Sequence, residues 1–455
     1  MQTEVNNRIS LKEKVSYGLG DMGNNFLFEM GQLYLLKFYT DSLGLPAATA
    51  GLVFLVAKIW DAFSDISIGT WVDNRKKIGK RGKFRPFMLY AALPLSLMTI
   101  VSFTTPNFSL TDRTIWAFAT YMIFGTVYSL FNIPYGSMIP TMTRDLIERS
   151  DLATWRWAGA NTGLLFTTVF FMPIVLKFDS MQTGYVVAVA VFALAGLVLQ
   201  LTCYANIKER YPVTKQETGK GAILKDYKSL FKNAPLLVLC VVNLLTFSAF
   251  NVKLQVQVYY CQYSLQNTYI VSEMGFFAIG CVYIGVLLAP FLVRRYGKKV
   301  TYILGAAIWA VGDLLAWFFA HTPVSFIAFA CMAFFGSSFI NTLNWALVSD
   351  VVEYGEWKTG NRSEGLVYSF FIFFRKLSQA LAGFIPGLVL AFVGYVPNAV
   401  QTPEALLGIK GLMFIYPCAL ALATFIIMFF LYKLTDAKCK DIVIELNERK
   451  LGIKN

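Results

Sequence analysis

Two aspartates stand inside an apolar stretch of this chain, which reads Ala57-Lys58-Ile59-Trp60-Asp61-Ala62-Phe63-Ser64-Asp65-Ile66. The runs 51–56 before it and 66–72 after it carry no charged residue. At a spacing of four, Asp61 and Asp65 lie on one face of a helix, with Lys58 about one turn before Asp61. A charge at membrane depth costs about 2.5 kcal/mol or more, so an acidic pair there requires a cation, a proton or a counter-residue. The stretch therefore predicts a membrane helix that takes part in ion coupling.

The composition indicates that a bilayer surrounds most of the chain. Of 455 residues, 56% are hydrophobic and 15% are charged, and the mean hydropathy is +0.55. A soluble protein carries about 25% charged residues. Apolar stretches of spanning length recur, and about twelve spans can be drawn. They cover residues 16–39, 47–72, 86–103, 115–140, 153–176, 185–205, 236–260, 274–293, 302–319, 324–351, 366–393 and 407–432. The sequence therefore predicts an all-α integral membrane protein.

The net charge of +13 is placed unevenly along the chain. Basic residues crowd alternate connections between the predicted spans, at 8–14, 75–85, 208–232, 294–299 and 433–454, and the other connections carry almost none. The positive-inside rule then places both termini in the cytoplasm, in a multi-pass protein that we expect in the bacterial cytoplasmic (inner) membrane. Because no soluble domain presents the basic clusters, we expect no nucleic-acid partner, and the expected partners are a small-molecule substrate and membrane lipid.

Residues suited to catalysis or metal binding are scarce. The seven cysteines show no paired spacing and fall mostly within predicted spans, so we interpret them as small apolar side chains. The single histidine, His321, lies in a predicted outer loop, and no nucleophile–base motif is visible. We therefore expect neither an enzyme nor a bound cofactor.

A weak internal repeat divides the chain. Short basic turns that contain glycine follow the second and the eighth predicted span, at 73–84 and 293–300. The major facilitator superfamily has two six-helix halves joined by a cytoplasmic linker, and its substrate site lies between the halves. The predicted division is an N-terminal half 1–207, a linker 208–232, a C-terminal half 233–434 and a cytoplasmic tail 435–455, and we expect a functional monomer.

Several motifs resemble one transporter family in particular. They are Tyr17-Gly18-Leu19-Gly20-Asp21, Trp60-Asp61-Ala62-Phe63-Ser64-Asp65, Gly82-Lys83-Phe84-Arg85-Pro86, Asn132-Ile133-Pro134-Tyr135-Gly136 and Asp350-Val351-Val352-Glu353-Tyr354-Gly355-Glu356-Trp357. Together they resemble the glycoside–pentoside–hexuronide:cation symporters, the group that contains the melibiose and glucuronide permeases. Within it the chain looks most like the sulfoquinovose importers, and several of the narrower matches are shared with the glucuronide permease.

The resemblance implies a cation site and a coupling residue. The family's two acids of the second helix and hydroxyl of the fourth correspond to Asp61, Asp65 and Ser129, and its eleventh-helix lysine corresponds to Lys376. Oxygen ligands suit Na⁺, whereas two close carboxylates can share a proton, so both coupling ions stay open. A metal role of Asp61 and Asp65 applies only if the ion is sodium.

The resemblance also implies a sugar site, with one departure. In the melibiose permease, acids on the first and fourth helices hold the galactosyl hydroxyls, and the matching positions here are Asn25 and Asn132. A family arginine of the fifth helix is kept as Arg156. Amides do not repel an anion, so the replacement of the two acids by asparagines favours an anionic sugar. Alternatively, the asparagines bind other hydroxyls.

Further polar residues within the predicted spans extend the candidate site. Glu29 and Lys253 lie on the first and seventh spans, and they either face the substrate or form a structural ion pair. Asn344 and Trp345 on the tenth span are candidate sugar contacts, since an indole can stack on a pyranose, although such a tryptophan can also serve packing. Asp313 in the ninth span is expected to pack against neighbouring helices.

The interpretation that combines these features is import of an anionic sugar or glycoside, with sulfoquinovose or its glycosides favoured, driven by Na⁺ or H⁺. Import of glucuronides, other hexuronides or neutral glycosides is the alternative. A lysolipid transporter is a remote third reading, because some members of the wider fold carry a similar acid pair.

Overall fold

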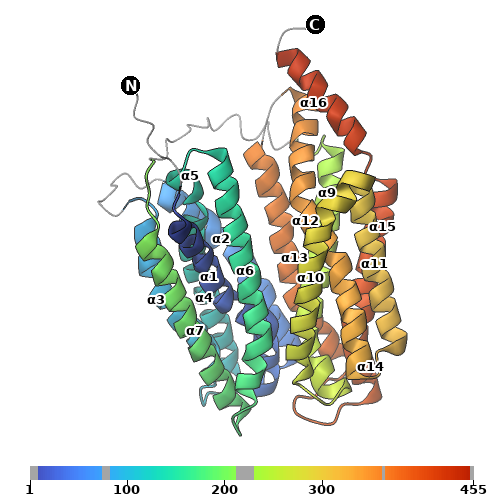
Figure 1. The fold of residues 1–455 in the computed structure, drawn as a ribbon. Coiled ribbons are helices and arrows are strands. Elements are labelled where there is room, and N and C mark those ends of the chain that lie inside the picture. Colours follow the sequence, from blue (N-terminus) through green and yellow to red (C-terminus); the bar gives the residue numbers. More distant parts are fainter. Residues whose placement is uncertain (1–8, 74–81, 212–229, 361–363, 451–455) are drawn as a thin grey trace. The chain divides into compact units, whose positions relative to one another are not determined.

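The computed structural model describes residues 9–73, 82–211, 230–360 and 364–450, and this part of the chain is predominantly helical (Figure 1). The predicted linker 208–232, the basic turn 73–84 and the predicted tail 435–455 fall partly outside these ranges. The chain divides into two compact units. The first comprises Met1–Lys215 and Gly387–Gln401, and the second comprises Gln216–Pro386 and Thr402–Asn455. The predicted domain boundaries themselves stay a prediction.

The helices follow the predicted spans closely. Those of the first unit are α1 (Leu11–Lys37), η1 (Phe38–Ser42), α2 (Ala47–Asp73), α3 (Arg85–Ser102), α4 (Leu110–Gly136), α5 (Ile139–Met142), α6 (Leu146–Val175) and α7 (Met181–Asn206). Those of the second are α9 (Ala234–Tyr259), η2 (Tyr260–Ser264), α10 (Ile270–Tyr296), α11 (Lys298–Phe319), α12 (Pro323–Thr359), α13 (Glu364–Phe392), α14 (Pro403–Lys410), η3 (Gly411–Ile415), α15 (Tyr416–Phe430) and α16 (Asp436–Lys450), with the last turns of α13 assigned to the first unit.

Ten helical segments within the described ranges are long and apolar enough to cross a membrane. The two other predicted spans, 16–39 and 366–393, correspond to the long helices α1 and α13. The predicted all-α membrane fold is therefore confirmed. The largest boundary difference is at α12, which continues to Thr359 and stops where Gly360 adopts a left-handed φ of 76°.

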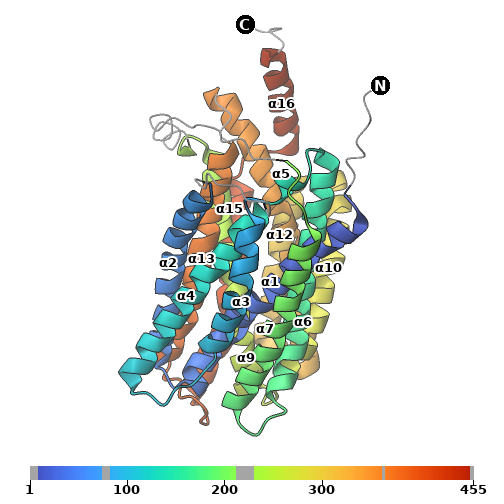
Figure 2. The ribbon, with the colours of Figure 1, turned by 90° about the vertical axis from the view of Figure 1, so that its left-hand side faces the viewer.

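Close packing of α1 against α6 and α7 organises the first unit (Figures 1 and 2). A Cβ added to Gly18 would lie 2.6 Å from the carbonyl oxygen of Trp155, and one added to Gly159 would overlap the carbonyl oxygen of Gly18. Small residues at a helix crossing let backbones approach in this way. The crossing brings Arg156, one residue after Trp155, alongside α1.

In the second unit α11 packs against α12 and α15, and α9 packs against α15. Large side chains such as Trp309 and Tyr302 are almost fully buried at these contacts. The short terminal helix α16 contacts α12 (Figure 1).

An acid from a distant segment caps the third helix of each half. Glu209, which follows α7, accepts hydrogen bonds from the backbone N–H groups of residues 83–85 at 2.8, 2.7 and 2.9 Å. Asp436, which follows α15, accepts from the backbone N–H of Lys298 at 2.8 Å. A carboxylate suits the orphan donors and the dipole of a helix start. These caps lie at the ends of the two basic turns that suggested the internal repeat.

Candidate functional site

The acid pair of α2 lies next to α4 within the first unit. Asp65 accepts a hydrogen bond on Oδ1 from the hydroxyl of Ser129. Asp61 accepts on Oδ2 from the ammonium of Lys58 at 3.3 Å. The structure thus brings three of the predicted cation-site residues to one contact between α2 and α4.

One carboxylate oxygen of this cluster is buried and unsatisfied. Among the residues that the structure describes, none is a hydrogen-bond partner of Asp61 Oδ1, and a Cβ added to Gly125 of α4 would lie 2.8 Å from Asp61 Cγ and overlap Oδ1. Lys58 lies 5.2 Å from the ring centroid of Phe28 and 5.7 Å from that of Tyr121. A buried acceptor without a donor is costly, so this oxygen suits a bound cation or a proton. The donor set, two carboxylates and a hydroxyl, is one that a hard cation such as Na⁺ accepts.

Lys376 belongs to α13 in the second unit, and its predicted proximity to the acid pair stays a prediction. Its neighbour Arg375 lies over aromatic rings of its own unit, 4.1 Å from the centroid of Phe247 and 5.7 Å from that of Trp345. Arg375 therefore makes cation–π contacts within the second unit.

The predicted ligands Asn25, Asn132 and Arg156 meet at the same turn of α1. Arg156 Nε donates to Asp21 Oδ2 at 3.2 Å. Asn132 accepts on Oδ1 from Asn24 at 3.1 Å, and Asn25 donates to the backbone carbonyl of Asp21 at 2.8 Å. Each of these side chains thus has a partner within the protein and presents only part of its hydrogen-bonding capacity to a ligand.

The guanidinium of Arg156 is also supported by an aromatic face. It lies 5.0 Å from the ring centroid of Tyr135. Tyr135 is held by reciprocal bonds with Tyr17, since each hydroxyl donates to the other residue's backbone carbonyl, at 2.5 and 3.0 Å. The Arg156 side chain is 29% exposed, so part of it remains accessible. A guanidinium has five N–H donors, so beyond the donor bound to Asp21 it can still bind an anion.

Lys253 has a partner that the sequence did not suggest. Its ammonium donates to Asp313 of α11, which also accepts from Trp309 Nε1 at 2.9 Å. Lys253 and Asp313 are almost fully buried, and Asp313 packs among helices as expected. A role of Lys253 in substrate binding, or in a pair with Glu29, stays a prediction that would require the ammonium to leave Asp313. Glu29 itself is half-buried on α1, one turn beyond Asn25.

The two candidate sugar contacts of α12 have different surroundings. Asn344 is buried and accepts a hydrogen bond from Tyr302 at 3.0 Å, which ties it to the helix core. Trp345 is 43% exposed and stacks on Tyr368 at 6.3 Å between centroids. Of the two, Trp345 is the more accessible to a ligand.

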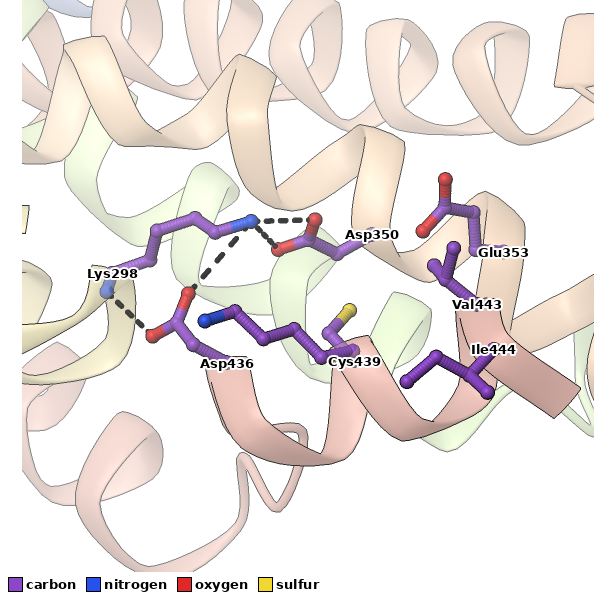
Figure 3. A pocket seen from close by; sticks show the side chains of 8 residues that line it. Lys298, Asp350, Glu353, Asp436, Cys439, Val443 and Ile444 are labelled. Atoms are coloured by element: carbon purple, nitrogen blue, oxygen red, sulfur yellow. Dashed lines mark hydrogen bonds and ion pairs between the residues drawn. The ribbon is translucent and has the colours of Figure 1, made fainter. Parts of the chain in front are cut away.

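A cavity of about 420 Å³ lies elsewhere in the second unit, between the start of α11, the end of α12 and α16 (Figure 3). Ligand atoms of Asp350, Glu353 and Cys439 lie within 4.8 Å of one another there. Both oxygens of Asp350 accept from Lys298 Nζ, at 2.6 and 2.5 Å, so the lysine already supplies the counter-charge (Figure 3). Burial raises the pKa of the Cys439 thiol to about 12, which keeps the thiol protonated in the absence of a metal ion. The chemistry here is that of an ion-pair network.

Sequence reasoning did not assign a site role to Asp21, Asn24 or Gly125. Asp21 stands four residues before Asn25 in the first predicted span, and an acid at that spacing on the face of a candidate ligand was a usable signal. Gly125 carried no such signal, because its effect depends on which side chain lies opposite.

A family model and several known proteins match most of the chain. The family model described as "MFS/sugar transport protein" matches residues 16–436. A Salmonella typhimurium protein named as a 2,3-dihydroxypropane-1-sulfonate exporter is 50% identical over 97% of both chains. A protein from the same organism named as a sulfoquinovose importer is 49% identical over 97% of this chain and 94% of its own. A Bacillus subtilis protein named as a symporter is 45% identical over 99% of this chain and 98% of its own.

Among solved structures, that of the nucleoside transporter NupG matches with a TM-score of 0.64 and 14% identity. It covers 92% of this chain and 99% of its own. At this identity the likeness concerns the fold alone.

Proposed function

The chain belongs to the MFS/sugar transport protein family, as its motifs suggested, and from this premise we propose that it is a cation-coupled symporter for an anionic sugar. As a multi-pass member of a transporter family, it moves a small molecule across a membrane and is not an enzyme. The proposal adds the coupling ion, the substrate charge and the direction of transport. The observation that carries it is the separation of two polar clusters within the first unit, one acidic and one built around an arginine.

The acidic cluster supports coupling to a monovalent cation. Asp61 and Asp65 contribute two carboxylates and Ser129 contributes a hydroxyl, which together form a set of oxygen ligands suited to a small cation. The unsatisfied Asp61 Oδ1 is a ready acceptor for Na⁺ or H⁺. Lys376 is proposed to link this site to the substrate. A relative named as a symporter supports coupling but does not identify the ion.

The arginine cluster supports an anionic substrate. Arg156 can bind two oxygens of a sulfonate or carboxylate, and the amides of Asn25 and Asn132 bind sugar hydroxyls without repelling the anion. Glu29 and Trp345 are further candidate contacts. Sulfoquinovose, or a glycoside of it, combines a sulfonate with a pyranose, and relatives are named for sulfonate transport. Glucuronides, other hexuronides and neutral glycosides are the alternatives, and a lysolipid is the remote one.

The test is uptake into membrane vesicles under a Na⁺ gradient or a proton gradient imposed separately. Labelled sulfoquinovose should accumulate under one of the two gradients. Competition should follow the order sulfoquinovosides, then glucuronides, then melibiose. Strong competition by melibiose and none by either anion would refute the anionic substrate.

Export of a three-carbon sulfonate is a second candidate function, favoured by the relative named as an exporter, whose identity equals that of the importer to within one percentage point. Both substrates carry a sulfonate for Arg156 to bind, but only sulfoquinovose also has a sugar ring whose hydroxyls the asparagines would bind. Counterflow decides between them. If the chain exports the three-carbon sulfonate, vesicles preloaded with 2,3-dihydroxypropane-1-sulfonate should exchange it faster than vesicles preloaded with sulfoquinovose exchange theirs.

The remaining features are proposed from sequence. Both termini lie in the cytoplasm of a bacterium, with the transporter in the inner membrane, and the monomer is the functional unit. The halves 1–207 and 233–434 alternate in access about the substrate, joined by the linker 208–232 and followed by the tail 435–455.

A further inference from the structure

Arg156 is a partly buried cation that the chain itself neutralises. Its Nε donates to Asp21 Oδ2 at 3.2 Å, and the two side chains are 29% and 10% exposed. They come from α6 and α1, whose backbones are held in close contact by Gly18 and Gly159. The contact is therefore a product of the helix crossing and is built into the first unit.

The hydrogen bond to Asp21 uses one of the N–H donors of the guanidinium. Asp21 is bound at the Nε side, and the ring of Tyr135 covers one face at 5.0 Å. The Nη atoms lie beside Gly136, where an added Cβ would come within 3.3 Å of Nη1. A guanidinium carries five N–H donors, so the Nη edge can hold two oxygens of an anion while Nε stays on Asp21.

A carboxylate in this position has two consequences in a low-dielectric site. When no substrate is bound, it spares the protein an uncompensated buried cation. When an anionic substrate is bound, its negative charge repels the ligand and weakens binding. The first effect favours the conformational change by which the empty transporter returns to its starting state. The second lowers the affinity for the anionic substrate and favours its release.

We propose that Asp21 is the resident counter-charge of Arg156, a positioning residue that holds the guanidinium in the empty transporter and competes with the anionic group of the substrate. This inference rests on the proposed function and names a determinant of substrate charge within the same site. The family resemblance assigns no role to Asp21 at this site.

The test compares two methyl glycosides that differ only at C6, methyl α-sulfoquinovoside and methyl α-glucoside. Binding to the purified full-length transporter is measured, together with net uptake and exchange in vesicles. In Asp21→Asn, the dissociation constant for the sulfonate should fall by on the order of tenfold, because repulsion is removed. Net uptake should slow, because the empty carrier now returns with an uncompensated charge, while exchange of loaded carriers should persist.

Three controls separate this role from a structural one. Asp21→Glu keeps the charge and should keep the wild-type affinity. Asp112→Asn removes an exposed acid at the start of α4 and should change nothing. The double variant Asp21→Asn/Arg156→Gln should lose the gain in sulfonate affinity, because no cation remains to be released. Asp21→Ser serves as the neutral variant if Asp21→Asn does not reach the membrane.

The outcomes are distinguishable. If the wild type does not bind the sulfoquinovoside, the proposed function fails. If the wild type binds it, and the neutral variants bind it no more tightly, or bind it more weakly, the role of Asp21 is refuted and the proposed function stands. An equal change for the glucoside would also refute it, since the effect must follow the charge at C6.

Discussion

Replacing Gly125 by alanine tests whether the carboxylate of Asp61 must occupy its present position. The added Cβ would lie 2.8 Å from Asp61 Cγ and closer still to Oδ1. The tighter contact is the one with Oδ1, so the carboxylate must retreat by roughly 1 Å or more before the new Cβ lies at an ordinary contact distance. Overpacking of this kind costs about 1–3 kcal/mol.

We expect the proposed cation site to bear most of that cost, because Asp61 Oδ1 is its proposed ligand and has no other partner among the described residues. At about 1.4 kcal/mol per factor of ten, cation affinity should fall by roughly 5- to 150-fold. Gradient-driven sugar accumulation in vesicles should fall with it, and a higher cation concentration should be needed for half-maximal uptake. Sugar exchange without a gradient should be retained, because the polar cluster of Arg156 is not touched.

Gly69→Ala is the matched control, because Gly69 lies on α2 with nothing within 4 Å of an added Cβ. It should transport like the wild type. If Gly125→Ala accumulates sugar as well as Gly69→Ala does, with the same half-maximal cation concentration, the assignment of Asp61 Oδ1 as a cation ligand is refuted.

Three further predictions concern other contacts. Asp61→Asn or Asp65→Asn should abolish accumulation in vesicles while some sugar binding persists, and accumulation at the wild-type level by either would contradict the cation site. Asp313→Asn should leave Lys253 buried without a counter-charge and destabilise the protein by about 3–5 kcal/mol; an unchanged thermal unfolding curve in detergent would argue against this ion pair. Glu209→Ala should cost about 1–2 kcal/mol by uncapping α3, measured in the same unfolding assay, and an unaltered midpoint would show that the cap is unimportant.

Much of the fold follows from local properties of the chain. Spanning length and hydropathy predicted the helices, because a segment in a bilayer must satisfy its backbone hydrogen bonds within itself. The boundaries were less accurate at α12, which stays helical as far as Thr359 although the apolar stretch ends near residue 351. Hydropathy reports where the bilayer ends, whereas the helix ends where Gly360 adopts its left-handed conformation.

The candidate site was predictable only in part. The acid pair of α2 could be read from a spacing of four, and the resemblance supplied Ser129 as its neighbour. Asn344 stays a predicted sugar contact, and the structure adds that it is buried and accepts a hydrogen bond from Tyr302, which the sequence did not indicate. Sequence places a polar residue on a helix, but the packing of the neighbouring helix decides which polar group it meets.

The sequence by itself determined the solvent, the helical class and the common face of Asp61 and Asp65, because these depend on composition and on the pitch of one helix. Only the tertiary structure decided that Asp21 meets Arg156, 135 residues away, since that contact depends on the glycine-mediated crossing of α1 and α6. The spacing of residues along one helix is set by backbone geometry, whereas contacts between helices are set by how closely their surfaces can approach.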